Sequence, residues 1–139
     1  MSLLTVQPGV DTYSLDDLGD PAILGIVAET DEVRRPLVAG IMGRIRGVGV
    51  IGVDSYSKLL EHFEPEEYKF AVLGIPIGCG GDPLRALRSL REDRLLPIFA
   101  LARTAEDLRL AGDNGADGAV LLREGYLPHL LDIIEGHLG

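Results

Sequence analysis

Polar and charged side chains follow several of the apolar runs in this sequence, where they could carry chemistry. Glu29 and Thr30 follow the run 23–28, Asp54 follows the run 47–53, and Arg103 follows the run 97–102. Mg²⁺ needs at least one or two carboxylates placed on it, and a covalent mechanism needs a nucleophile. The run 70–74 ends in Gly74, which offers neither a carboxylate nor a nucleophile. The ends of these runs therefore predict a poor site for metal or phosphoryl chemistry.

Two glycine-rich stretches could be taken for phosphate-binding motifs. Gly47–Gly52 fits the spacing G-x-G-x-x-G, but we place it inside a strand, whereas the dinucleotide fingerprint follows a strand and opens a helix. The loop Gly78–Gly81 precedes a helix start, where backbone amides can cradle anions, yet no Lys or Ser/Thr follows as in a P-loop. We interpret this loop as a mobile connection rather than a phosphate site.

Composition narrows the remaining classes of function. The net charge of -9 repels nucleic-acid phosphates, and no apolar run is long enough to span a membrane. Cys79 is the only cysteine, and the histidines at 62, 129 and 137 form no zinc-like spacing with it. We therefore expect a cytoplasmic protein with no resident metal or other cofactor, no bound nucleic acid and no membrane association.

Apolar runs alternate with amphipathic segments along most of the chain. The predicted strands are 23–28, 47–53, 70–74, 97–102 and 118–122, and the predicted helices are 31–43, 55–63, 83–91, 105–111 and 127–137. Thr30 is expected to cap the first helix, and Pro36 to kink it or shift its start. Arginines 85, 88 and 91 form a stripe on the third helix, either solvated or a docking surface for an acidic partner.

This alternation predicts an α/β fold of (βα)5 type, with a parallel sheet covered by helices on both faces. Residues 22–139 form this domain. Residues 1–21 hold many turn formers and acids, so we expect an N-terminal arm with little regular structure. Ligands of such sheets bind at the carboxyl ends of the strands, which makes the five strand ends the first candidates for a site.

The order and spacing of these elements resemble the receiver domain of bacterial response regulators, a CheY-like and flavodoxin-like fold with strand order 2-1-3-4-5. The resemblance covers about residues 22–138. Its best local matches are segments 70–74, 83–91, 96–102 and 114–122.

The resemblance implies five site groups: two acids after the first strand, a phosphoacceptor aspartate on the third, a Thr or Ser on the fourth and a Lys on the fifth. Here the acid pair reads Ala28-Glu29, and the other positions read Gly74, Ala102 and Leu122. The resemblance therefore implies a degenerate pseudo-receiver that lacks the phosphoacceptor aspartate. We assign it no catalytic residue and no metal ligand.

We therefore expect a non-enzymatic signalling module that binds a protein partner, or a second copy of itself in a homodimer, without phosphorylation. The resemblance implies that the fourth helix, fifth strand and last helix form the binding face. Its candidate residues are Leu108, Ala119, Leu121, Tyr126 and His129. The alternative is a flavodoxin-like small-molecule-binding domain or enzyme that uses Glu29, Asp54 and the loop 78–81.

Overall fold

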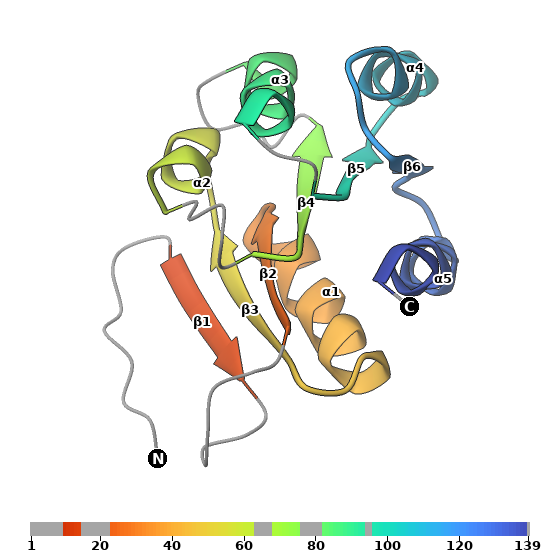
Figure 1. Ribbon diagram of the computed structural model, residues 1–139. Coiled ribbons are helices and arrows are strands. Elements are labelled where there is room, and N and C mark those ends of the chain that lie inside the picture. The colour runs from red at the N-terminus through yellow and green to blue at the C-terminus, as the bar shows by residue number, and fades with distance from the viewer. Residues whose placement is uncertain (1–9, 15–22, 63–67, 76–81, 94–95, 139) are drawn as a thin grey trace.

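The computed structural model describes residues 10–14, 23–62, 68–75, 82–93 and 96–138 (Figure 1). The elements, in chain order, are β1 (Val10–Ser14), β2 (Ile23–Ala28), α1 (Asp31–Arg44), β3 (Val48–Val53), α2 (Tyr56–His62), β4 (Phe70–Ile75), α3 (Pro83–Asp93), β5 (Ile98–Ala102), α4 (Ala105–Asp113), β6 (Gly118–Leu121) and α5 (Tyr126–Leu138).

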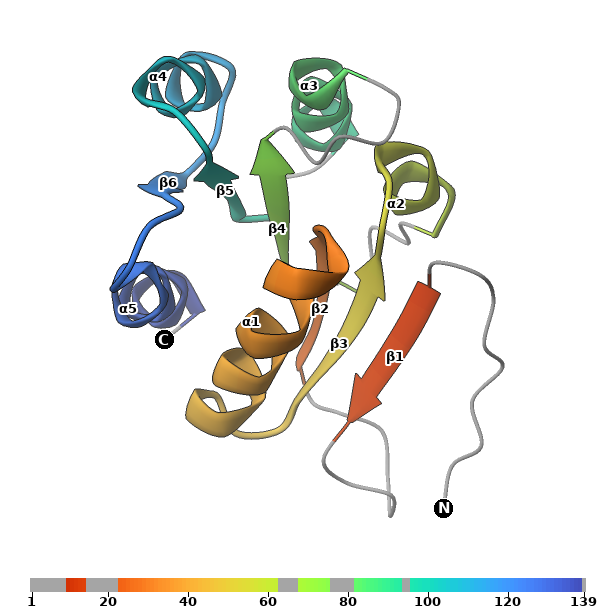
Figure 2. The same ribbon diagram turned by 180° about the vertical axis from the view of Figure 1, so that it is seen from behind.

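Strands β2 to β6 form the predicted parallel sheet. The full sheet runs β1-β3-β2-β4-β5-β6, and within it the five parallel strands have the order 2-1-3-4-5. Helices α1 and α5 cover one face of the sheet, and α2, α3 and α4 cover the other (Figures 1 and 2). The predicted flavodoxin-like (βα)5 fold is thus confirmed.

The first strand corrects the expectation for the N-terminal arm. Val10–Ser14 pairs antiparallel with β3, in a register that sets Val10 beside Val53 and Ser14 beside Gly49. The prediction of little regular structure is therefore wrong for these five residues. A short strand of mixed polarity has no strong pattern of its own, and here it is defined by backbone pairing to the edge that β3 would otherwise leave open.

The core has two halves, one on each face of the sheet, because successive side chains of a strand point to opposite faces. On one face Ile26, Leu73 and Ala100 pack with α2, α3 and α4. On the other, Val27, Val72 and Leu101 pack with α1 and α5. The interior strands are buried along nearly their whole length, as expected of parallel strands covered on both sides.

The starts of α3 and α4 follow local sequence signals. The Thr104 hydroxyl accepts a hydrogen bond from the Asp107 amide at 3.1 Å and caps α4. Asp82 accepts from the Leu84 amide at 3.0 Å, with Pro83 as the first residue of α3. Thr30 occupies the N-cap position of α1, but its side chain makes no capping hydrogen bond, so that prediction is wrong. Pro36 lies inside α1, which still begins at Asp31.

The glycines of the G-x-G-x-x-G stretch lie in the turn before β3 and in β3 itself. Gly47 turns the chain with a φ of 73°, and Gly49 and Gly52 belong to β3. The motif therefore opens no helix, as predicted. None of the helices in the described part of the chain has the length and hydrophobicity that a bilayer crossing requires.

Candidate functional site

The parallel strands end together at one edge of the sheet, which we call the carboxyl edge. Glu29 directly follows β2, and Gly74 is the second-to-last residue of β4. Ala102 is the last residue of β5, and Leu122 directly follows β6. The fold thus brings all four positions singled out in the sequence to the same edge. Their side chains differ sharply in polarity, and Glu29 is the only ionisable group of the four.

Glu29 makes the strongest polar contact at the carboxyl edge. Its carboxylate binds the Arg103 guanidinium through two parallel hydrogen bonds, from Nη2 to Oε1 at 2.6 Å and from Nη1 to Oε2 at 2.7 Å. Oε1 also accepts the Thr30 amide at 2.8 Å. The Glu29 side chain is 0% exposed and that of Arg103 25%. Such a two-pronged pair is the geometry in which arginine best neutralises a buried carboxylate.

The Glu29–Arg103 ion pair spans the end of β4. Strand β4 lies between β2 and β5 in the sheet, so a contact between residues that follow β2 and β5 must pass over it. Ala28 pairs with Leu73, which brings Glu29 level with Gly74, and Gly74 in turn pairs with Leu101. The strand that the ion pair crosses therefore carries a glycine at this level.

A second arginine holds the other side of Glu29. Arg34, in the first turns of α1, is 2% exposed and donates from Nη1 to the Glu29 carbonyl oxygen at 2.8 Å. Its Nη2 pairs with the Asp31 carboxylate. The Arg34 side chain therefore fastens the start of α1 to the main chain at the end of β2.

The polar groups at the ends of β3 and β4 are also occupied. Asp54 pairs with the Lys58 ammonium at 3.1 Å. The buried Tyr56 hydroxyl donates to the Gly74 carbonyl oxygen at 2.6 Å. The structure thus keeps Asp54 and Glu29 on separate partners instead of joining them into one acidic site.

Mg²⁺ does not fit this arrangement. Both carboxylate oxygens of Glu29 already accept hydrogen bonds from a cation, and Gly74 contributes no second carboxylate. Within the described residues, no group of three or more His, Cys, Asp or Glu side chains could hold a metal ion. The loop 78–81 and Cys79 lie outside the described residues.

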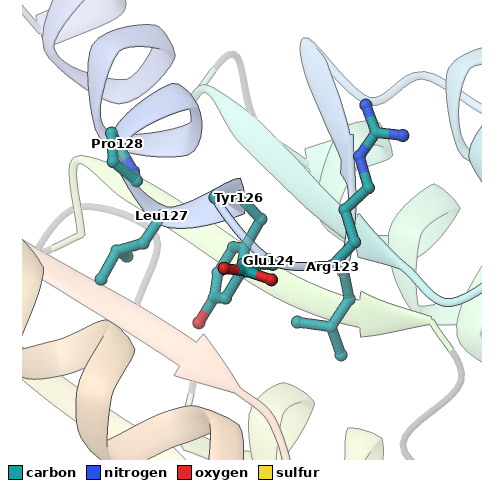
Figure 3. A pocket seen from close by; sticks show the side chains of 7 residues that line it. Arg123, Glu124, Tyr126, Leu127 and Pro128 are labelled. Atoms are coloured by element: carbon teal, nitrogen blue, oxygen red, sulfur yellow. The ribbon is translucent and has the colours of Figure 1, made fainter.

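Tyr126 lies at the start of α5, beside the Glu29–Arg103 ion pair. Partial burial and the Glu29 charge raise the pKa of Tyr126 above its ordinary value, while the Arg103 charge acts in the opposite direction. Residues 122–128, which form the connection from β6 and the first residues of α5, line a pocket of about 360 Å³. Figure 3 shows the Tyr126 ring and Leu127 pointing toward the sheet side of this connection, whereas the guanidinium of Arg123 points away.

The position of Tyr126 makes a prediction about its titration. Glu29→Gln should lower the pKa of Tyr126, because a nearby negative charge is removed, and Arg103→Met should raise it, because a positive charge is removed. Ultraviolet difference titration of each variant measures the shift, with Tyr126→Phe identifying the contribution of this ring. Shifts of the same sign in both variants would contradict the placement of Tyr126 between opposite charges.

The candidate binding face, comprising Leu108, Ala119, Leu121, Tyr126 and His129, is assembled from neighbouring elements. Strand β6 is the last strand of the sheet, and it lies between α4 and α5 in both views (Figures 1 and 2). His129 is exposed, and the four other residues are partly exposed. Ala119 and Tyr126 also pack against the two halves of the core, so only part of each side chain is accessible beside the edge strand.

The arginine stripe of α3 has contacts within the chain. Arg88 donates to the Asn114 side chain at 2.9 Å, and Arg91 pairs with Asp117 at 2.5 Å. Asp117 also accepts the Ile98 amide at 2.7 Å. Two of the three arginines therefore fasten α3 to the α4–β6 connection, which favours a structural role over docking of an acidic partner.

Comparison with known proteins establishes the fold of the chain but not its family or its function. No protein-family model and no curated protein matches the chain. The receiver domain of the TMAO respiratory system response regulator TorR superposes with a TM-score of 0.71 at 19% identity, over 84% of this chain and 96% of that one. The fold is that of a receiver domain.

Further solved structures agree on this receiver fold. The BeF3-activated receiver domain of Klebsiella pneumoniae RstA has a TM-score of 0.68 at 23% identity, over 83% of this chain and 97% of its own. A response regulator receiver protein from Pseudoalteromonas atlantica gives 0.68 at 13% identity, over 84% and 96%. The matches cover nearly the whole of both of those chains, although few residues are identical to those of this chain.

The sequence placed two strand ends one residue away from their observed positions, since β4 extends to Ile75 and β6 stops at Leu121. It also did not reveal the partner of Glu29. Arg103 was noted as the residue after β5 without a role, and Arg34 and Tyr56 were not singled out. A usable signal was present: an acid and an arginine occupy the first position after two strands of one parallel sheet, with a glycine on the strand between them.

Proposed function

We propose that this chain is a pseudo-receiver, a receiver-fold domain that binds a protein partner without being phosphorylated. The observation that carries the proposal is the Glu29–Arg103 ion pair. A buried carboxylate saturated by an internal guanidinium has no free oxygen for a metal, and Gly74 beneath it has no nucleophile. An aspartyl-phosphate switch therefore lacks both its acceptor and its cation.

The remaining positions support the same proposal. Ala102 is a fully buried methyl group with no hydroxyl for a phosphoryl oxygen. Leu122 packs against the core on the α1 and α5 face instead of presenting an ammonium. No catalytic role follows for any of these side chains, so the proposed activity is binding and not catalysis.

The candidate binding face is where we place the partner. It combines the open edge of β6 with partly exposed apolar side chains on α4, β6 and α5. Either a different protein or a second copy of this chain in a homodimer would cover it. Arg109 is paired with both Glu106 and Asp113 on α4, so these three groups leave a net negative charge beside the face.

A thermal-shift screen tests this proposal against a small-molecule or metal-binding role. Mg²⁺, Mg²⁺ with beryllofluoride, nucleotides and flavins should each leave the melting temperature unchanged, because a ligand stabilises only a fold that has a site for it. Glu29→Gln removes the negative charge that pairs with Arg103. This variant serves as the control for the effect of charge at the carboxyl edge. Saturable stabilisation by Mg²⁺ with beryllofluoride would contradict the proposal, and stabilisation by a flavin or nucleotide would favour the alternative role.

A further inference from the structure

We propose that the Glu29–Arg103 ion pair is an internal clamp that positions the starts of α4 and α5, and with them the candidate binding face. This inference rests on the proposed function for the meaning of that face. The inference adds how the candidate binding face is regulated. Side chains of the chain itself hold this face in one conformation. Glu29 and Arg103 are positioning residues here, since neither belongs to the face itself.

The first link runs from Arg103 to α4. Arg103 is followed directly by Thr104, whose hydroxyl and carbonyl oxygens accept the amides of Asp107 and Leu108 at 3.1 and 3.0 Å. The Arg103 amide donates to the Ile75 carbonyl oxygen at 3.1 Å, and its Nη1 reaches the Leu101 carbonyl oxygen at 3.3 Å. The residue that pairs with Glu29 is thus fixed at both ends immediately before the cap of α4.

The second link runs from the ion pair to α5. The Leu122 amide donates to the Ala102 carbonyl oxygen at 2.7 Å, so the end of β6 is held by the residue before Arg103. Tyr126, the first residue of α5, lies within electrostatic reach of both Glu29 and Arg103. Its neighbour Leu127 packs on Gly40 of α1, where an added Cβ would lie 3.1 Å from it. The connection that leads to α5 is therefore joined by a backbone hydrogen bond to Ala102, the residue directly before the arginine of the ion pair.

The third link is Gly74. The ion pair passes over β4 level with this residue, so the position where a phosphoryl-accepting side chain would stand lies on the strand that the clamp crosses.

Native-state hydrogen exchange of the full chain tests the clamp. In Arg103→Met, the amides of Asp107, Leu108, Leu122 and Tyr126 should exchange about tenfold faster or more, after correction for the change in global stability, because a local opening is released. The amides of Ala71 and Asp117, which bond to Pro97 and Ile98 at the opposite edge of the same strands, are the internal reference and should not change after this correction.

Arg109→Met is the matched control, since it removes an arginine of α4 that pairs only with exposed acids. It should leave the four reporter amides unchanged. Glu29→Gln should reproduce the effect of Arg103→Met, because it removes the charge of the other partner. Equal acceleration at both edges of the sheet, or acceleration confined to Asp107 and Leu108, would overturn the clamp. Either result would leave the phosphorylation-independent function standing, because that function is tested by other measurements.

Discussion

Replacing Arg103 by methionine is expected to lower the free energy of unfolding by about 3–5 kcal/mol at neutral pH, the usual cost of leaving a buried charge without its partner. The Glu29 side chain is completely buried, so water cannot replace the lost guanidinium. Equilibrium denaturation in urea measures the loss. Arg109→Met, which breaks an exposed pair, should leave the free energy of unfolding nearly unchanged.

A double variant identifies the cause of the Arg103→Met loss. Glu29→Leu combined with Arg103→Met should recover most of the lost stability, because an apolar pair needs no compensation. A double variant as unstable as Arg103→Met alone would mean that packing, and not charge, dominates.

Gly74→Asp is expected to remain unphosphorylated by acetyl phosphate even though it restores the acceptor. Ala102 still lacks a hydroxyl and Leu122 an ammonium, and each such donor is worth about 10²-fold in rate. The two losses together predict a rate about 10⁴-fold below that of a receiver with the full set. Intact-mass spectrometry over time measures the rate, and phosphorylation within minutes would contradict the account.

The same variant should also lose stability at neutral pH. A carboxylate at position 74 would lie level with Glu29 and compete for Arg103, so two acids would share one cation. Like charges favour uptake of a proton, and the loss should therefore shrink as the pH is lowered. Gly74→Asn, which has the same shape without the charge, separates repulsion from crowding. Equal stability of the two variants at neutral pH would exclude the electrostatic cause.

The fold could be predicted from the sequence because its strands are buried on both faces. Runs such as Phe70–Ile75 and Ile98–Ala102 are continuously apolar, and each is followed by a segment of helical spacing. β1 could not be predicted in this way, because its formation depends on pairing with the edge of β3 and not on a sequence pattern of its own. Thr30 shows a similar limit: a residue suited to capping occupies the cap position without making the bond.

The candidate site was predicted in position but not in chemistry. Each strand end was identified by where an apolar run stops, and the topology then brought those ends together. The pairing of Glu29 with Arg103 joins residues 74 positions apart across an intervening strand. Such a contact requires the strand order and the register as well as the residue types, so local spacing alone could not reveal it.

Exposure of the wild-type domain to acetyl phosphate and Mg²⁺, followed by intact-mass spectrometry, tests the central claim most directly. The claim is that the carboxyl edge is closed to phosphoryl chemistry by Gly74 and by the Glu29–Arg103 ion pair. We predict an unchanged mass under conditions that phosphorylate a competent receiver domain run in parallel. A stoichiometric gain of one phosphoryl group on an acidic residue of the wild-type chain would contradict the claim.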